Sequence, residues 1–177
     1  GIVLHQHLQF LCQFGLYRLQ HFSLQEEQKK WRSQLLNLGL LPDELPYALH
    51  ILKQAWENLQ HDTRAAWILD NKHRDSHAEY ALSWRTEEGY QHYILDRTFI
   101  DEQGTRWIID YKTSQAHHLS PSEFLQQEQA AYRQQLENYA RIFAELDTRP
   151  IKLGLYFPLL PAWIEWAYGT SLVVPAI

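Results

Sequence analysis

The change in the spacing of apolar residues near residue 76 is the feature that most constrains the fold. Before this point apolar residues recur at intervals of three and four, and from His77 onward they alternate with polar ones. Intervals of three and four place side chains on one face of a helix, whereas alternation is typical of a half-buried strand. The pattern predicts a helical layer over residues 1–75 and a sheet-containing core over residues 76–177.

The first 75 residues favour helices separated by short connections. Helices are predicted over residues 2–20, from Ser23 to about Gly39, and from about Pro46 to Gln60. Ser23 and Glu26 have the spacing of a capping box, which would begin the second helix. Short helical or loop material is expected between the third helix and the first strand.

The remaining residues favour strands around one long helix. Strands are predicted over residues 77–85, about 90–100, about 105–112, 151–158 and 162–168, and a helix from Pro121 to about Leu146. One face of the first strand is expected to carry Ala78, Tyr80, Leu82 and Trp84. A turn is expected at residues 87–89, and Ser120 with Glu123 predicts a capping box for the long helix. This order of elements predicts an α/β or α+β chain in which helices pack on one sheet.

Composition narrows the class of protein and its setting. With 177 residues, of which 45% are hydrophobic, the chain is expected to form a single domain with its own core. A single cysteine, Cys12, excludes an internal disulfide and a four-cysteine metal cluster, which favours a cytoplasmic setting. The net charge of −5 means that any contact with DNA needs a local groove of Lys and Arg. There is no run of about 18 apolar residues, so no membrane span is expected.

Two missing features bear on the organisation of the full polypeptide. The chain has no methionine and no phosphate-binding loop of the G-x-x-x-x-G-K-[ST] type. We therefore expect a domain excised from a longer polypeptide, with any use of ATP located elsewhere.

Two carboxylates interrupt the apolar runs of the central hairpin. Asp96 ends "YILD" and Asp110 ends "WIID", and Lys112 follows two residues later on the same face of the strand. If Asp96 pairs with Asp110, then Thr98 pairs with Ile108, a five-residue loop remains, and the two acidic Cβ atoms lie roughly 4.5–5.5 Å apart. Like charges at this distance are destabilising unless one is protonated or a cation lies between them. The hairpin therefore predicts a site for a hard divalent cation such as Mg²⁺, with Lys112 available to a phosphate oxygen or a metal-bound hydroxide.

A structural interpretation of the same residues stays open. Asp96 can instead pair with Arg97 or Arg106 at a sheet edge, and Asp110 and Lys112 can form a solvated stripe. The apolar residues around both acids favour the metal site, because they indicate that the two strands do not face solvent.

The ordered motifs of the chain resemble the RecB-type branch of the PD-(D/E)xK nucleases, found at the C-terminus of UvrD/RecB-like helicase-nucleases. The hairpin "LDRTFID…WIIDYKT" resembles the I-D-R and I-I-D-Y-K-T pattern, "GIVLHQ" the N-terminal G-x-x-x-H motif, "QLENY" the Q-L-x-x-Y helix, and "LGLYFP" the strand that follows. The chain departs from the branch at Tyr93, where a small residue is common. The resemblance implies an α/β fold with a restriction-endonuclease-like core, a mixed central sheet flanked by helices, and an added N-terminal helical layer.

The resemblance also implies the ligands of a metal. His5, Asp96 and Asp110 would bind Mg²⁺ or Mn²⁺, and the carbonyl of Tyr111 would complete the shell. From the residues alone, His5 and His7 cannot be separated, because residues two apart on a helix point about 200° away from each other and only one can enter a shared site. The resemblance favours His5.

Three further residues receive roles from the resemblance. Lys112 would orient or stabilise the nucleophilic water and the charge of the phosphorane, beside the catalytic Asp96 and Asp110. Gln135 and Tyr139 would support the site or contact the DNA backbone, since they lie one helical turn apart on one face.

Two polar residues of the predicted strands have less definite roles. Glu79, on the strand before the hairpin, is equally compatible with an accessory acid of the site and with a solvated strand residue. Arg97 points away from Asp96 in a regular strand and is expected to pair structurally.

The function implied by the resemblance is that of a Mg²⁺- or Mn²⁺-dependent DNA nuclease, expected to be an exonuclease, in recombination and repair. Its expected partners are DNA and a helicase, either in the same polypeptide or in a partner subunit. Two alternatives stay open. One is a catalytically inactive nuclease fold that binds DNA or a partner subunit, and the other is a stand-alone enzyme that acts on RNA or on a special DNA structure.

Overall fold

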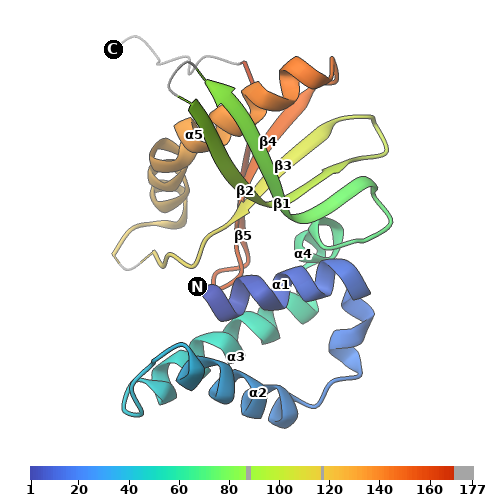
Figure 1. Ribbon diagram of the computed structural model, residues 1–177. Coiled ribbons are helices and arrows are strands. Elements are labelled where there is room, and N and C mark those ends of the chain that lie inside the picture. Colours follow the sequence, from blue (N-terminus) through green and yellow to red (C-terminus); the bar gives the residue numbers. More distant parts are fainter. Residues whose placement is uncertain (87–88, 117, 170–177) are drawn as a thin grey trace.

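The chain forms one mixed sheet with helices packed on it (Figure 1). The computed structural model describes residues 1–86, 89–116 and 118–169. Its five strands lie in the order β1-β2-β3-β4-β5, and only β3 and β4 of this described sheet pair in parallel. The expectation of an α/β chain with a mixed central sheet flanked by helices is therefore confirmed.

The helices fall close to their predicted positions. They are α1 (Ile2–Phe14), the 3-10 helix η1 (Leu16–Gln20), α2 (Leu24–Asn37), α3 (Leu45–His61), α4 (Thr63–Ile68) and α5 (Pro121–Leu146). The helix predicted over residues 2–20 is too long, because Gly15 takes a φ of 86°, a left-handed conformation that ends α1. None of the described helices is both long and apolar enough to cross a membrane.

The two predicted capping boxes have different outcomes. At the start of α5, the Ser120 side chain accepts from the Glu123 N–H and the Glu123 side chain accepts from the Ser120 N–H, as predicted. At the start of α2, the Ser23 side chain makes no cap hydrogen bond, so the box with Glu26 is wrong. The acid that this turn buries is Glu27, which pairs with Lys30 at 2.6 Å.

The strands also match the prediction in number and order. They are β1 (Arg74–Thr86), β2 (Gly89–Ile100), β3 (Arg106–Tyr111), β4 (Ile151–Phe157) and β5 (Ala162–Ala167). The turn predicted at residues 87–89 lies partly outside the described residues. The predicted five-residue loop between β2 and β3 is present, and Thr98 pairs with Ile108 as the metal-site register requires. Helix α5 connects β3 to the parallel strand β4, as such a crossover must.

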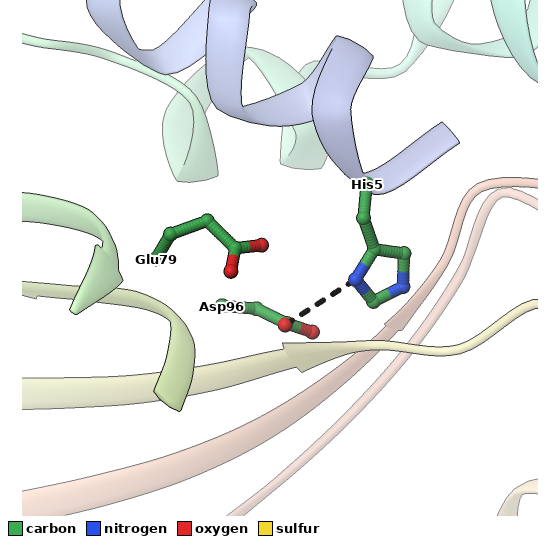
Figure 2. A group of neighbouring side chains, drawn as sticks. All are labelled: His5, Glu79 and Asp96. Carbon is green, nitrogen blue, oxygen red and sulfur yellow. Dashed lines mark ion pairs between the residues drawn. The ribbon is translucent and has the colours of Figure 1, made fainter. Parts of the chain in front are cut away.

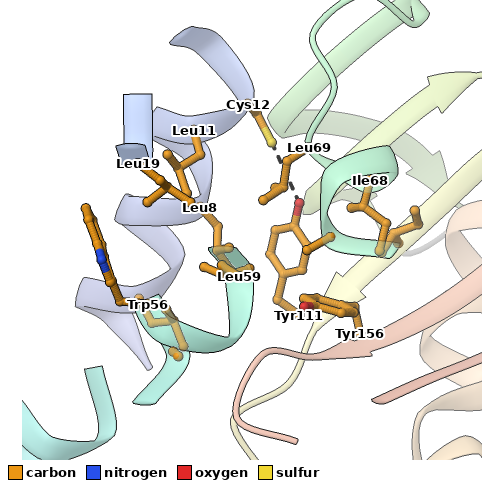
Figure 3. Packing of buried hydrophobic residues seen from close by; sticks show 14 of the residues in the cluster. Leu8, Leu11, Cys12, Leu19, Trp56, Leu59, Ile68, Leu69, Tyr111 and Tyr156 are labelled. Carbon is orange, nitrogen blue, oxygen red and sulfur yellow. Dashed lines mark hydrogen bonds between the residues drawn. The ribbon is translucent and has the colours of Figure 1, made fainter. Parts of the chain in front are cut away.

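Two separate cores cover the two faces of the sheet. On one face, a core that includes Leu8, Trp56 and Tyr111 joins α1, α3 and α4 to the strands (Figure 3). On the other face, a core that includes Leu136 and Leu155 joins α5 to the strands. The sheet is thus the middle layer of three.

The apolar alternation of β1 and β2 changes phase within both strands. In β1, Ala78 packs with the core of the helical layer and Tyr80 with the core of α5. In β2, Leu95 packs with the core of α5 and Phe99 with the core of the helical layer. Residues an even number of positions apart share a face in a regular strand, so both strands turn over between these residues. The prediction that Ala78 shares the face of Tyr80 is therefore wrong.

Arg97 fixes the structure beside this change of phase. Its side chain donates to the carbonyls of Ile68 and Asp70, each at 2.8 Å, and to the Ser76 hydroxyl at 2.7 Å. Ile68 ends α4, so Arg97 satisfies a carbonyl that the helix leaves without a partner. The residue is only 1% exposed. The structural role predicted for Arg97 is confirmed.

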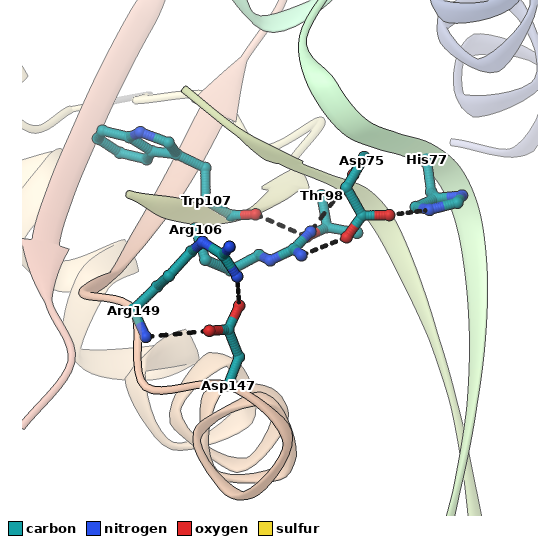
Figure 4. A network of polar contacts seen from close by, with 7 residues as sticks. All are labelled: Asp75, His77, Thr98, Arg106, Trp107, Asp147 and Arg149. Atoms are coloured by element: carbon teal, nitrogen blue, oxygen red, sulfur yellow. Dashed lines mark hydrogen bonds and ion pairs between the residues drawn. The ribbon is translucent and has the colours of Figure 1, made fainter. Parts of the chain in front are cut away.

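A second arginine ties the start of β1 to β3 (Figure 4). Arg106 forms an ion pair with Asp75, and the hydrogen bond from this arginine lowers the pKa of the Asp75 carboxyl. The Arg106 guanidinium also lies 5.0 Å from the ring centre of Phe143 on α5. Both arginines that the sequence offered as partners for Asp96 are therefore engaged elsewhere.

Candidate metal centre

Three side chains from three elements meet beside α1 (Figure 2). His5 comes from α1, Glu79 from β1 and Asp96 from β2. The distance between His5 Nδ1 and Asp96 Oδ1 is 3.3 Å, and one potential ligand atom from each of the three residues lies within 4.8 Å of the other two. All three residues are half-buried. The group has the dimensions of a metal-binding cluster.

Glu79 reaches Asp96 because of the pairing between β1 and β2. Ala78 pairs with Arg97 and Tyr80 pairs with Leu95, so Glu79 lies opposite Asp96 at the point where both strands change phase. Glu79 has a φ of 50°, in the left-handed region that a residue with a side chain adopts rarely. Such strain is tolerated where the surrounding structure enforces it and is often found at functional sites.

Asp110 lies on the other side of Asp96. The pairs Thr98–Ile108 and Arg97–Ile109 have the register expected for a shared site, and the ladder ends one position before Asp96 and Asp110. By this register Asp96 lies between Glu79 and Asp110, and the three acids are referred to below as the acidic row. The ligand atoms that the structure brings within 4.8 Å of one another are those of His5, Glu79 and Asp96, and the predicted ligand Asp110 lies outside this group. Like charges placed in one row repel each other unless a proton or a cation intervenes.

The Asp96 carboxylate replaces the next bond of the β2–β3 ladder. The ladder ends at Arg97–Ile109, and the N–H of Tyr111 then donates to Asp96 Oδ2 at 2.7 Å. The N–H and the carbonyl of one strand residue point to the same neighbouring strand, so the Tyr111 carbonyl also faces β2. Its role as a metal ligand stays a prediction.

Lys112 lies against Asp110 rather than in solvent. Its Nζ is 2.7 Å from Asp110 Oδ2 and 3.5 Å from the ring centre of Tyr132 on α5. Asp110 is 8% exposed, so the solvated stripe considered from the sequence is wrong. The contact with Lys112 is a short ion pair that partly offsets the cost of burying the Asp110 charge.

The electrostatics of the row follow from burial and mutual repulsion. Burial, and then the charge of Asp96, raises the pKa of Asp110 to about 6, although Lys112 acts in the opposite direction. The same two causes raise the pKa of Glu79. The hydrogen bond with Asp96 raises the pKa of His5 against the effect of burial. Burial and the charge of Asp96 therefore disfavour the ionised forms of Glu79 and Asp110.

Gln135 and Tyr139 lie on α5 beside this row. Gln135 Nε2 donates to the Tyr139 hydroxyl at 2.8 Å, and the ring of Tyr139 packs edge-on against Tyr93 at 5.3 Å. Burial raises the pKa of Tyr139, and the charges of Asp110 and Asp96 add to the effect. The structure thus brings the α5 pair to the acidic row from the face opposite α1. Whether the two residues contact DNA stays a prediction.

The two histidines of α1 point in different directions, as expected from their spacing. His5 faces Asp96, whereas the ring of His7 lies between Trp31 and Trp56, with ring-centre distances of 6.0 and 5.0 Å. Only His5 of this pair reaches the acidic row.

Sequence reasoning missed or left open two members of the site. Tyr132 was not identified, since nothing in the sequence shows which face of α5 approaches Lys112. Glu79 was left undecided between the site and solvent. A possible signal for Glu79 is its position at the change of apolar phase, with Ala78 before it and Tyr80 after it.

The donor set fits a hard divalent cation. His5, Glu79 and Asp96 offer one imidazole and two carboxylates within 4.8 Å of one another, whereas Asp110 lies outside this group. Carboxylates are ligands that Mg²⁺ and Mn²⁺ prefer, and imidazole is a ligand of transition metals. The close approach of the potential ligand atoms of His5, Glu79 and Asp96 is the observation that supports the fit. A cation at this place would also offset the repulsion within the row.

Comparison with known proteins adds no assignment to this geometry. The chain matches none of the models of known protein families, and no curated protein matches its sequence.

Proposed function

We propose that this chain is a metal-dependent DNA nuclease with a restriction-endonuclease-like core, of the RecB-type branch that its motifs resemble. The observation that carries the proposal is the meeting of His5, Glu79 and Asp96 beside the buried ion pair of Asp110 and Lys112. A purely structural role gives no reason to gather Glu79, Asp96 and Asp110, because neighbouring carboxylates repel each other unless a proton or a cation intervenes. A site that receives a cation and a phosphate explains the arrangement.

Different residues would have different roles in phosphodiester hydrolysis. His5, Glu79, Asp96 and Asp110 would hold Mg²⁺ or Mn²⁺. Such an ion, when bound, lowers the pKa of a water ligand and offsets charge on the phosphate. The neighbouring Lys112 would hold an ammonium group close to the attacking oxygen and to the developing negative charge.

Lys112 is held in place by two contacts of the described chain. Its main-chain N–H donates to the carbonyl of Tyr156 on β4 at 2.9 Å, and its ammonium lies over Tyr132. A cation over an aromatic face is attracted to the ring. This support holds the side chain beside Asp110.

The test is digestion of supercoiled plasmid and of single-stranded oligonucleotides by the purified chain with Mg²⁺, with Mn²⁺ or with EDTA. We expect cleavage with either metal and none with EDTA. Asp110→Ala and Lys112→Ala are each expected to reduce the rate at least about 100-fold, the range found when one group that stabilises transition-state charge is removed. Glu57→Gln, a change on the surface of α3, serves as the matched control and is expected to keep the wild-type rate.

A folded wild-type chain that cuts neither DNA nor RNA with metal would contradict the enzymatic proposal. If such a chain still binds DNA, the inactive binding module considered from the sequence becomes the better description. Cleavage of RNA alone would favour the stand-alone ribonuclease. Within the proposal, a helicase in the same polypeptide or in a partner subunit would deliver the strand in recombination and repair.

A further inference from the structure

An apolar cavity of about 480 Å³ lies next to the candidate metal centre. Its walls are the first turn of α1, the end of α2, the first half of α3 and the segment that follows Lys112. Ile2, Leu38 and Tyr47 line it although they are 61%, 53% and 67% exposed. An exposed apolar patch that surrounds a cavity is typical of a binding site.

Two walls of the cavity continue directly into the metal centre. Residues 1–4 line the cavity and His5 is the next residue of α1, so consecutive residues of one helix belong to the cavity and to the metal centre. Thr113 and Gln115 also line the cavity and follow Lys112 in the chain. A strand whose phosphate lies at the metal centre would therefore have a neighbouring nucleotide at the mouth of the cavity.

The chemistry of the lining selects a base rather than a phosphate. Glu44 is the only charged side chain among the described residues that line the cavity, and it would repel a phosphate. The other walls are aliphatic side chains and the ring of Tyr47, while Thr113 and Gln115 supply polar groups for the edge of a base. The volume lies in the range of pockets for small ligands, whereas a protein helix needs a groove long enough for anchors over two turns.

We propose that this cavity, referred to below as the α1–α3 pocket, binds one unstacked nucleobase of single-stranded DNA. The strand then runs from the pocket to the metal centre, an orientation that rests on the proposed nuclease function. A base held in a duplex cannot enter unless it leaves its stack, at a cost of a few kcal/mol, roughly 2 to 4. Single-stranded DNA is therefore the preferred substrate class.

The test measures the contribution of bases to binding, separately from cleavage. Fluorescence anisotropy in EDTA compares a twelve-residue oligothymidylate with an abasic chain of the same length and charge. The wild-type protein is expected to bind the oligothymidylate about 5- to 100-fold more tightly, which is the effect of stacking one base on a protein surface. A duplex of the same length is expected to bind no more tightly than the abasic chain.

Substitutions on α3 locate this preference. Ala48→Trp fills the pocket and is expected to make the affinities for the oligothymidylate and the abasic chain about equal. His50→Trp lies on an exposed part of the same helix outside the lining and is expected to keep the wild-type difference between the two affinities. Tyr47→Ala removes an exposed ring and provides a second test if the Ala48 variant does not fold, as judged by circular dichroism. It is expected to lower the preference severalfold.

The outcomes separate the pocket from the catalytic proposal. Either of two results overturns the inference, even if the chain cuts DNA. One is equal affinity of the wild type for the oligothymidylate and for the abasic chain. The other is a higher affinity for the oligothymidylate that persists in folded Ala48→Trp and in Tyr47→Ala. A preference lost in these variants supports the inference even if no DNA is cut. If the wild type binds both chains equally and sediments as a dimer that Ala48→Trp dissociates, the pocket is an interface between copies and the inference is wrong.

Discussion

At the scale of single residues, Asp96 joins the structure of the sheet to the candidate chemistry. One of its oxygens accepts the N–H of Tyr111, and the other faces His5. Its neighbours across the sheet, Glu79 and Asp110, have raised pKa values because burial and the charge of Asp96 disfavour their ionised forms. The main chain therefore depends on Asp96, whereas Asp110 contacts Lys112 and Glu79 belongs to the cluster with His5.

Glu79→Gln is expected to weaken binding of Mn²⁺ about tenfold, the lower end of the range for loss of a supporting group at a metal site. The reason is the loss of one anionic oxygen from the cluster with His5 and Asp96. Isothermal titration calorimetry checks the dissociation constant, with Glu57→Gln as the control for a lost surface charge. An unchanged constant for Glu79→Gln would show that Glu79 is a strand residue only.

Asp110→Asn is expected to stabilise the metal-free protein by about 1 to 3 kcal/mol at pH 7 to 8, because it removes a buried charge while it keeps the shape. The same change is expected to abolish cleavage. The pKa of Asp110 is about 6 in the folded chain, against 3.8 for an ordinary aspartate. Ionisation of this group therefore opposes folding fully above pH 6, and the penalty disappears below pH 3.8.

Thermal unfolding in EDTA across this pH window measures the Asp110→Asn effect. The gain in stability raises the melting temperature by about 2–4 °C per kcal/mol for a chain of this size. A variant that is less stable than the wild type at pH 8 would show that the ion pair with Lys112 outweighs the cost of burial.

At the scale of elements, Arg97 holds the end of α4 against the start of β1. Arg97→Lys keeps the charge but cannot reach the carbonyls of Ile68 and Asp70 and the Ser76 hydroxyl together. We expect a loss of about 2–4 kcal/mol in the free energy of unfolding, since buried acceptors lose charged donors. Urea denaturation provides the measurement.

The matched control for this change is Arg85→Lys, at an exposed position of β1. It is expected to change the free energy of unfolding by less than about 0.5 kcal/mol. Equal effects of the two substitutions would contradict the clamp role of Arg97.

At the scale of the whole molecule, a tryptophan cluster connects the helical layer to the far strands of the sheet. Trp163 on β5 lies 5.9 Å from Trp107 on β3 and 6.4 Å from Trp67 on α4, measured between ring centres. Its indole also covers Gly154, where an added Cβ would lie 2.0 Å from a ring carbon. The close approach requires glycine at this position of β4.

Gly154→Ala is therefore expected to displace Trp163 and to lower the free energy of unfolding by about 1–3 kcal/mol, as overpacking does. The double variant Gly154→Ala/Trp163→Leu is expected to lose less than the sum of the two single changes, because the smaller side chain relieves the clash. Additive losses in denaturant unfolding would show that the contact does not limit the packing.

Most of the fold could be predicted from the sequence, because the local sequence patterns agree with the helices, strands and turns that form in the structure. The change of period near residue 76, the capping box at Ser120 and the five-residue loop each depend on short stretches of chain. The lengths of α1 and β1 were less predictable, because Gly15 and the irregular start of β1 at Asp75 act through backbone conformations that the residue types do not reveal.

The candidate site was predictable only in part. The hairpin register up to Arg97–Ile109, one position before Asp96 and Asp110, was accessible to sequence reasoning. The approach of Glu79 and of Tyr132 depends on how β1 bends and on which face of α5 meets Lys112. Both are consequences of packing between distant segments, which a single sequence does not encode locally.

The simultaneous turnover of β1 and β2 at Glu79 and Asp96 has a consequence for finding similar sites in other chains. A regular alternation of apolar and polar residues does not fit the whole of either strand, because the alternation is interrupted at the acid. Each strand can instead be divided at its acid into two half-strands, and the apolar alternation of the second is then shifted by one residue from that of the first. The acid marks the position of this shift. Two acids that each lie at such a shift, and that face each other in a hairpin, form a pattern with which similar sites can be searched for without a shared motif.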